Sequence, residues 1–224
     1  GRDDIVSRVR RLYIDGPGEF NGPPMRVISC HLGGSSSIAG IENGISIGAS
    51  MGFSPQSGLP QNNRVGDLDS MAIPYVAKML DLSVEEAERQ LNHESGLLGL
   101  SGVSNDLRDI HIAAEEGNTD AQLAHDVLVE SIRHWAGSFF FKMGGAEVIS
   151  FTAGIGENNA SLRAAVCAGL EDLGVRIDNS ANEKISGGME GIISTPESPI
   201  KVMVVPANEE LVIAREVYRH VKSA

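Results

Sequence analysis

Basic residues are scarce in this chain. Its 224 residues include 18 Lys and Arg against 30 Asp and Glu, a formal net charge of −12. This excludes nucleic-acid binding through a broad basic surface, because neutralising phosphates requires clustered Lys and Arg. A small anionic ligand remains compatible with the charge, since helix ends, a metal ion and a few arginines act locally.

Long apolar runs are also lacking. None approaches the roughly 20 residues that a helix needs to cross a bilayer, and the polar start Gly1-Arg2-Asp3-Asp4 is unlike a signal peptide. We therefore expect a cytoplasmic protein without membrane contact. An initiator Met is missing as well, and residues 1–9 resemble the end of a helix, so we expect a fragment of a longer protein.

Cysteine is rare too: Cys30 and Cys167 lie in apolar patterns without a partner at metal-ligand spacing, which predicts two buried thiols. The hydrophobic content of 42% and mean hydropathy of −0.05 are typical of a globular protein with a sizeable core. There is no internal repeat, low-complexity segment or linker. A single domain is therefore favoured.

Three short runs near the start predict an antiparallel meander, at residues 25–32, 36–42 and 45–49. Asn43-Gly44 separates the last two runs, and this pair favours a two-residue turn with positive φ at both positions. The loop at 50–66, rich in Gly, Pro, Gln and Asn, is too long for a simple connector, so we expect it to be functional.

Helices and further strands follow this loop. Ser83 and Glu86 form a predicted capping box. Helical patterns cover 70–80, 84–91, 106–116, 118–143, 159–173 and 208–221, and strand patterns cover 146–152 and 200–205, with short elements around 175–177 and 191–194. The apolar part of the long helix, 135–141, fits either the core or an interface. The order predicts an α/β fold whose mixed sheet carries helices on both faces.

The segment from Phe151 to Asn158 carries the strongest single motif, a buried-strand pattern that passes through two glycines into a helix. Glycines let a ligand approach the backbone, and free N–H groups at a helix start favour anionic or polar groups. The plainer alternative is a tight turn, because this is neither the full dinucleotide pattern nor a P-loop.

Six segments resemble, in order, the C-terminal half of acetate kinases. They are His31–Ser37, Ser50–Pro55, Asn63–Asp69, Ser104–Asp109, the Gly154 turn and Pro206–Glu210. The resemblance covers nearly all the chain after Met25 and implies the actin-like ATPase (ribonuclease H-like) fold of acetate and sugar kinases, heat-shock ATPases and actin. We expect residues 1–224 to be the C-terminal domain, with 1–24 a residual linking helix and loop and the N-terminal catalytic domain absent.

The resemblance also implies a reaction. Acetate kinases transfer a phosphoryl group from ATP to a short-chain carboxylate with Mg²⁺, giving an acyl phosphate and ADP in a cleft between two domains. The implied partners are therefore ATP or ADP, a short carboxylate, the missing domain and a second copy in a homodimer. Because the missing domain supplies further catalytic residues, we expect this chain alone to have little or no kinase activity.

Several roles follow from this match. Arg64 matches the family's catalytic arginine and would hold the acceptor carboxylate or the transferring phosphoryl group with its planar guanidinium. His31 would donate to a phosphate oxygen, and Gly33 and Gly34 would let backbone amides approach it. Pro55 would line the acyl pocket. Outside the family, each would be an ordinary loop or strand-end residue.

The nucleotide-binding residues come from two segments. Asp106, Leu107 and Arg108 match the segment that contacts adenosine, at the start of a helix that Ser104 or Asn105 could cap. A carboxylate in the first helical turn is also ordinary dipole complementation, which is the plainer interpretation.

The resemblance places Gly154, Ile155 and Gly156 along the adenine and ribose, with Asn158 capping the next helix. Glu209 matches the carboxylate that acts on Mg²⁺ through ordered water. Without the resemblance, Asn208-Glu209-Glu210 is simply an N-cap followed by acidic first-turn residues.

Two departures from the family pattern leave alternatives open. Most acetate kinases carry Asn where this chain has Gly34, and Pro60–Asn63 replaces a small, Thr-containing run before Arg64. His31–Gly34 resembles butyrate kinases, whereas other segments stay close to acetate kinases. The alternatives are a propionate or butyrate kinase, or a noncatalytic nucleotide-binding or dimerisation module of a divergent paralogue.

Overall fold

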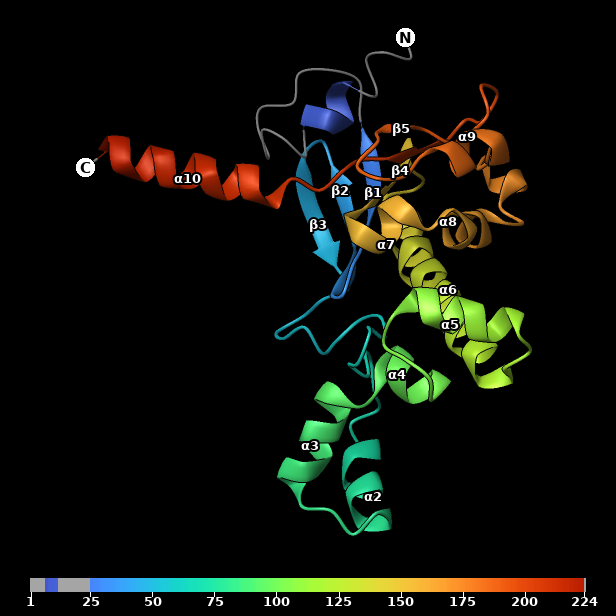
Figure 1. Ribbon diagram of the computed structural model, residues 1–224. Helices are drawn as coiled ribbons and strands as arrows, with labels where there is room; N and C mark the ends of the chain where they lie inside the picture. The colour runs from blue at the N-terminus through green and yellow to red at the C-terminus, as the bar shows by residue number, and fades with distance from the viewer. Residues whose placement is uncertain (1–6, 12–24, 224) are drawn as a thin grey trace.

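A six-stranded mixed sheet forms the centre of the protein, as the computed structural model shows for residues 7–11 and 25–223 (Figure 1). The strand order is β3-β2-β1-β4-β6-β5. The strands are β1 (Arg26–Leu32), β2 (Ser36–Glu42), β3 (Ile45–Ala49), β4 (Val148–Thr152), β5 (Gly191–Ile192) and β6 (Lys201–Val204).

The first three strands form the predicted antiparallel meander, while β4 pairs parallel with both β1 and β6. Asn43 and Gly44 have φ values of 50° and 85°, which confirms the turn predicted between β2 and β3. Asn43 also fixes the start of β1, because its Oδ1 accepts a hydrogen bond of 2.9 Å from the backbone N–H of Met25.

Helices occupy most of the remaining chain. They are α2 (Ala72–Met79), α3 (Val84–His93), α4 (Gly96–Ser101), α5 (Leu107–Glu115), α6 (Thr119–Lys142), α7 (Ala153–Asn158), α8 (Ala160–Cys167), the 3₁₀ turn η1 (Glu171–Leu173), α9 (Asn179–Lys184) and α10 (Glu209–Ser223). The predicted capping box of Ser83 and Glu86 is present at the start of α3. In Figure 1, α2 and α3 form a pair at the bottom, and α10 extends from the body on the left.

The main core lies between one face of the sheet and helices α5, α6 and α8. Alternate residues of the central strands, including Ile28, Cys30 and Phe151, are buried there. Phe139 of α6 reaches β2 closely, since a Cβ on Gly40 would lie 2.7 Å from its ring. On the other face, Val9 of the helical segment 7–11 packs with strand residues. Helices therefore cover both faces, as predicted.

The structure differs from the sequence prediction in two helical regions. Helix α4 was missed, because its six residues include two glycines, which weaken a helical pattern. The helix predicted at 159–173 is shorter: α7 begins directly after β4, α8 ends at Cys167, and η1 follows. The rest of the expected linking segment 1–24, apart from residues 7–11, lies outside the described residues.

Cys30 and Cys167 are buried free thiols, as predicted, and burial raises the pKa of Cys167 to about 12. Both line a small apolar cavity of about 130 Å³ between the sheet and α6. Thiols that stay protonated are poor nucleophiles, so these two belong to packing. Among the described helices, none is both long enough and apolar enough to span a membrane.

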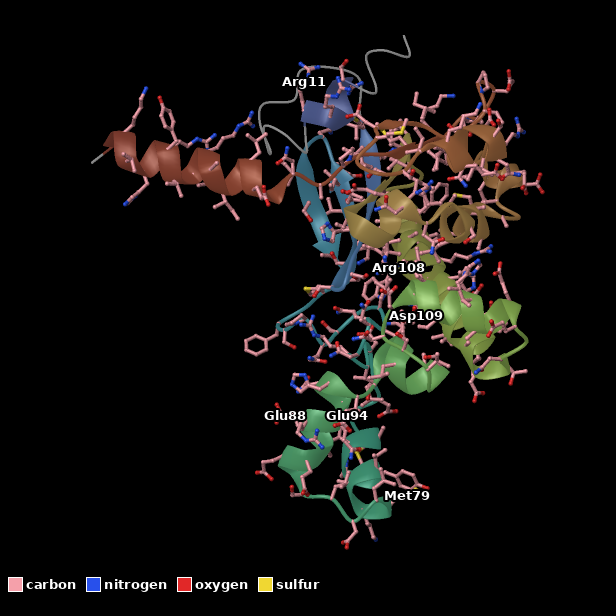
Figure 2. The ribbon with its side chains drawn as sticks, in the orientation of Figure 1. Arg11, Met79, Glu88, Glu94, Arg108 and Asp109 are labelled. Carbon is pink, nitrogen blue, oxygen red and sulfur yellow. The ribbon has the colours of Figure 1, made fainter. Side chains whose placement is uncertain are left out.

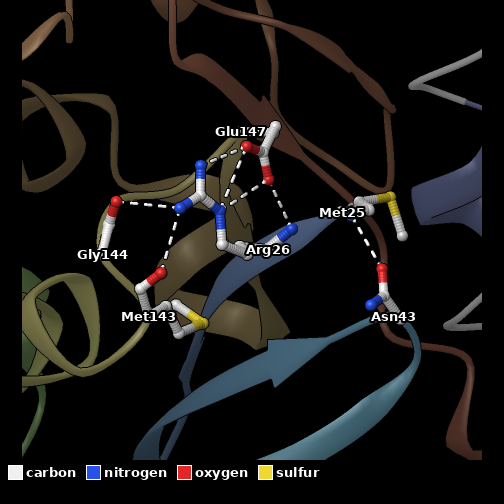
Figure 3. A network of polar contacts seen from close by, with 6 residues as sticks. All are labelled: Met25, Arg26, Asn43, Met143, Gly144 and Glu147. Atoms are coloured by element: carbon white, nitrogen blue, oxygen red, sulfur yellow. Dashed lines mark hydrogen bonds and ion pairs between the residues drawn. The ribbon is translucent and has the colours of Figure 1, made fainter. Parts of the chain in front are cut away.

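An ion pair joins the start of β1 to the turn between α6 and β4 (Figure 3). Arg26 forms a bidentate contact with Glu147, with Nη2–Oε1 at 2.5 Å, and donates from Nη1 to the carbonyls of Met143 and Gly144. These carbonyls belong to the C-cap of α6 and to the residue after it, where the helix supplies no donor. Arg26 therefore closes the end of α6 and fixes it to the central strand.

Replacing Arg26 with Met is expected to lower the free energy of unfolding by about 2 kcal/mol at neutral pH, because a charge-assisted pair and a helix cap are lost together. Burial acts to raise the pKa of Glu147, but the hydrogen bonds from Arg26 outweigh it and hold the pKa below its ordinary 4.5. A carboxyl group whose pKa is lower in the folded protein than in the unfolded chain stabilises the fold at pH values above its ordinary pKa. This stability is lost as the pH falls through the pKa of the folded protein.

Urea unfolding of both proteins should therefore give curves that converge as the pH falls below the ordinary 4.5 and through the lowered pKa of Glu147. The matched control is Arg89→Met, which removes the exposed pair with Glu94 and should cost less than about 1 kcal/mol. Equal costs for the two variants at neutral pH would contradict the assignment.

Candidate functional site

A cleft of about 460 Å³ brings together residues from four separate parts of the chain. It lies where the β1–β2 turn, the loop before α4, the start of α5 and helix α7 meet. Its lining consists of Gly33, Gly34, Asn62, Asp106, Leu107, Arg108, Gly154, Ile155, Asn158 and Asn159. Most of the residues that the sequence assigns to nucleotide binding therefore line this one cleft.

The β1–β2 turn and the start of α7 are direct neighbours. A Cβ on Gly33 would lie 3.5 Å from the Cβ of Ala153 and 3.3 Å from the carbonyl of Ser35. The turn is held by its own contacts, since the N–H of Gly33 donates to the backbone and side-chain oxygens of Ser35 and Ser36. Because β1 and β4 are parallel neighbours, their carboxyl ends lie at the same edge of the sheet, and the β1–β2 turn and the start of α7 both begin there.

Backbone strain in this region lies at Ala153 rather than at the glycines. Ala153 has φ of 65° and is buried, and α7 begins at this residue. A non-glycine residue with positive φ costs on the order of 1 kcal/mol or more, and such residues concentrate at functional sites. The strained turn directs the chain from the end of β4 along the cleft.

Two residues of α7 lie differently from expectation. Gly156 is buried, where a Cβ would contact Phe151 and the carbonyl of Cys30, so it allows α7 to pack on the sheet and does not line the cleft. Asn158 does not cap the next helix; its Nδ2 donates to the carbonyl of Gly154. Asn159 is the N-cap of α8, because α7 continues through Asn158.

The opposite wall is the start of α5. Asp106 itself is the N-cap and accepts from the N–H of Arg108, which corrects the expected caps at Ser104 or Asn105. The Arg108 side chain adds a bidentate contact, with Nη2–Oδ2 at 2.6 Å. Hydrogen bonds from Arg108 lower the pKa of Asp106 to about 2. Figure 2 shows Arg108 near the middle of the molecule, above the α2–α3 pair that Met79 and Glu88 mark.

The loop that carries Arg64 is fixed to the start of α4. The backbone N–H groups of Ser95, Leu97 and Leu98 donate to the carbonyls of Asn63, Gln61 and Asn62 at 2.8–3.1 Å. These are N–H groups that a helix start leaves without an intrahelical partner. The missed helix α4 is therefore what holds this loop in place.

The Arg64 guanidinium points back to the β1–β2 turn. Its Nη1 donates to Ser35 Oγ at 2.7 Å and to Gln61 Oε1 at 3.1 Å. Gln61 in turn donates from Nε2 to the carbonyl of Pro55 at 2.6 Å. Arg64 and exposed Pro55 are thus joined through one buried glutamine, although neither lines the cleft itself.

His31, the penultimate residue of β1, pairs in register with Thr152 at the end of β4. Paired residues share a sheet face, here the face opposite to the main core. Neither residue lines the cleft. The Thr152 hydroxyl is buried without a hydrogen-bond partner among the described residues, so a polar group is left unsatisfied beside the turn into α7.

A second cavity of about 400 Å³ adjoins the cleft and shares Gly154 with it. Its lining includes Glu157, Asn208 and Glu210 at the start of α10. Glu209 begins this helix, and its side chain lies outside the described part of the structure. No group of three or more metal-ligating side chains occurs among the described residues.

Sequence patterns missed four residues of this site. Ser35 and Gln61 hold Arg64, and Asn62 and Asn159 line the cleft. Polar residues in a loop give no signal of their own. The docking of residues 61–63 on α4 brings Asn62 to the cleft and Gln61 to Arg64.

Known proteins resemble this chain over most of its length. The acetate kinase of Staphylococcus aureus (strain JH9) is 47% identical over 213 residues, which span 95% of this chain and 52% of that protein. The acetate kinase of Staphylococcus carnosus (strain TM300) is 48% identical over 201 residues, 88% of this chain and 50% of that protein. The chain thus spans about half the length of the relatives it matches.

Solved structures show the same fold. The crystal structure of Porphyromonas gingivalis acetate kinase matches with a TM-score of 0.82 at 38% identity, covering 86% of this chain and 48% of that one. A propionate kinase from Francisella tularensis matches with a TM-score of 0.81 at 32% identity, covering 94% and 53%. Residues 20–215 match the Acetokinase family. The protein has the actin-like ATPase fold of acetate kinases and belongs to the acetokinase family.

Proposed function

We propose that this chain is the C-terminal, nucleotide- and substrate-binding half of an acetate kinase, which forms acetyl phosphate and ADP from acetate and ATP. The observation that carries the proposal is the single cleft that joins the Gly33–Gly34 turn, Asp106–Arg108 and Gly154–Asn158. Membership of the acetokinase family supports the reaction class.

In this proposal, the nucleoside lies between the start of α5 and helix α7. Leu107 and Ile155 supply apolar contact for the base, while Asp106 and Asn158 lie within reach of ribose hydroxyls. The phosphates extend toward Gly33 and Gly34, where backbone amides approach without side chains between them. His31, next to this turn at the end of β1, donates to a phosphate oxygen.

Arg64 is the proposed catalytic residue of this half. Its guanidinium is bound to the neutral oxygens of Ser35 and Gln61, and no carboxylate contacts it within the described residues. Its charge is therefore available to neutralise the transferring phosphoryl group and the acceptor carboxylate, which in-line transfer requires. Pro55 provides an apolar wall for the methyl group of acetate.

Mg²⁺ would be held mainly by the nucleotide phosphates and water, with Glu209 acting through water from the start of α10. It would neutralise phosphate charge during transfer. The protein would act as a homodimer, which the exposure of Phe141 on α6 supports (89% exposed). Sedimentation that finds only monomer at high concentration would reject the dimer.

A coupled assay for acetyl phosphate formation tests the function. The chain alone is expected to show little or no turnover, because the other half of the cleft is absent. Joined to the N-terminal half of the S. aureus acetate kinase, it should turn over, and Arg64→Gln in the joined protein should reduce kcat by at least about a hundredfold.

Two outcomes would contradict the proposal. Turnover by the chain alone at the level of a complete kinase would refute the missing-half argument. A folded joined protein that binds ADP but never turns over would favour the noncatalytic module. Rates with acetate, propionate and butyrate then decide the acyl preference.

A further inference from the structure

Gly34 and Asn62 face each other across the end of the cleft. A Cβ on Gly34 would lie 4.0 Å from Nδ2 of Asn62, and no other described atom beyond the adjoining residues comes within that distance. Both residues line the cleft. Gly34 is therefore a spatial neighbour of Asn62, which belongs to the second segment that departs from the family pattern, Pro60–Asn63.

The Asn62 backbone is fixed, while its side chain has no partner in the described part of the chain. Its carbonyl accepts a 2.9 Å hydrogen bond from Leu98 at the start of α4, and the carbonyls of Gln61 and Asn63 are bound in the same way. Within the described residues, the half-buried Asn62 amide makes no hydrogen bond. A positioned donor thus faces the cleft with its hydrogen-bonding capacity unused.

The charges around the cleft indicate which part of a ligand lies here. Arg108 at the far wall is neutralised by its bidentate contact with Asp106. Arg64, two residues from Asn62, contacts only neutral oxygens among residues 7–11 and 25–223. An anionic group is therefore more stable at the Gly34–Asn62 end than at the Asp106 end.

We propose that Asn62 is a phosphate-binding residue, whose Nδ2 donates to a phosphate oxygen of a bound nucleoside di- or triphosphate. Its amide takes the place of a side chain that Gly34 lacks, because an asparagine at position 34 would extend into the same space. This inference rests on the proposed function, since it assigns one contact within that nucleotide site.

Calorimetric titration of the full 224-residue chain with Mg·ADP and with adenosine tests it. Asn62→Ala is expected to weaken ADP binding about tenfold and leave adenosine binding unchanged, because only the phosphate contact is lost. Moving the amide back, in the double variant Gly34→Asn with Asn62→Ala, should restore ADP affinity to within about threefold of the original. Gly34 has no positive φ, so its backbone accepts asparagine.

The matched control is Asn63→Ala, which removes the neighbouring amide outside the cleft and should change neither affinity. Unchanged ADP affinity in Asn62→Ala overturns the inference and leaves the proposed function standing. Equal losses for ADP and adenosine also overturn it, because they indicate a structural role. If the unaltered chain binds no ADP at all, the proposed nucleotide site is wrong, and this inference is wrong with it.

Discussion

Replacing Gly96 with alanine is expected to lower the free energy of unfolding by about 4 kcal/mol, the sum of backbone strain and overpacking. Gly96 begins α4 with φ of 60°, and an added Cβ would lie 2.1 Å from the carbonyl oxygen of Gln61 and 2.5 Å from that of Arg64. These are backbone atoms, so no side-chain rotation relieves the clash. The loop must move away from the helix.

Gly96→Ala should also disturb the site. If residues 61–64 leave the start of α4, Asn62 loses its position at the cleft and Arg64 loses its contact with the β1–β2 turn. We therefore expect the variant to lose measurable ADP binding even at temperatures at which it remains folded. Thermal unfolding should show a Tm about 12 °C lower, and calorimetry should show the lost binding.

Gly102 is the matched control because it ends the same helix with φ of 62° and has no atom within 4 Å of its missing Cβ. Gly102→Ala carries the same conformational strain without the clash, and should cost only about 1 kcal/mol. Similar costs for the two variants would mean that the contact between loop and helix does not determine the position of Arg64.

Arg163→Met should have a comparable effect on stability, again about 4 kcal/mol, because it leaves several buried acceptors without donors. The Arg163 side chain is fully buried. Its guanidinium donates to five acceptors on α7 and in the α9 region, namely the carbonyls of Gly156, Glu157, Asn182 and Ile185 and the Oδ1 of Asn182.

This arginine joins the cleft wall to the α9 region. It satisfies the carbonyls at the end of α7, whose other face lines the cleft, and so fixes the helix against α9. Arg176→Met is the control, since Arg176 is exposed and its loss should cost less than about 0.5 kcal/mol. Denaturant unfolding measures both, and a small cost at Arg163 would show that water replaces it.

Local patterns were enough to predict most of the fold. Apolar alternation located β1, β2 and β3, and Asn118 and Ser83 precede the helices they cap. The regions that were missed or predicted wrongly depend on tertiary contacts. Helix α4 is stabilised by the carbonyls of a distant loop. Helix α7 requires a positive φ at Ala153, which an alanine in the sequence does not predict.

The sequence predicted which motifs form the site, but not how their residues are arranged in space. The resemblance named residues near 33, 106 and 154, and the structure places these in one cleft. The contact between Gly34 and Asn62, and the path from Arg64 through Gln61 to Pro55, arise only when the loop docks on α4. No spacing rule relates residues that meet through a third element.

A crystal structure of this chain grown with ADP and Mg²⁺ tests the central claim most directly. We predict the nucleoside between Asp106–Arg108 and Gly154–Asn158, with the diphosphate directed to Gly34 and Asn62. ADP bound at another surface, or a cleft that stays empty at saturating ADP, would contradict the account.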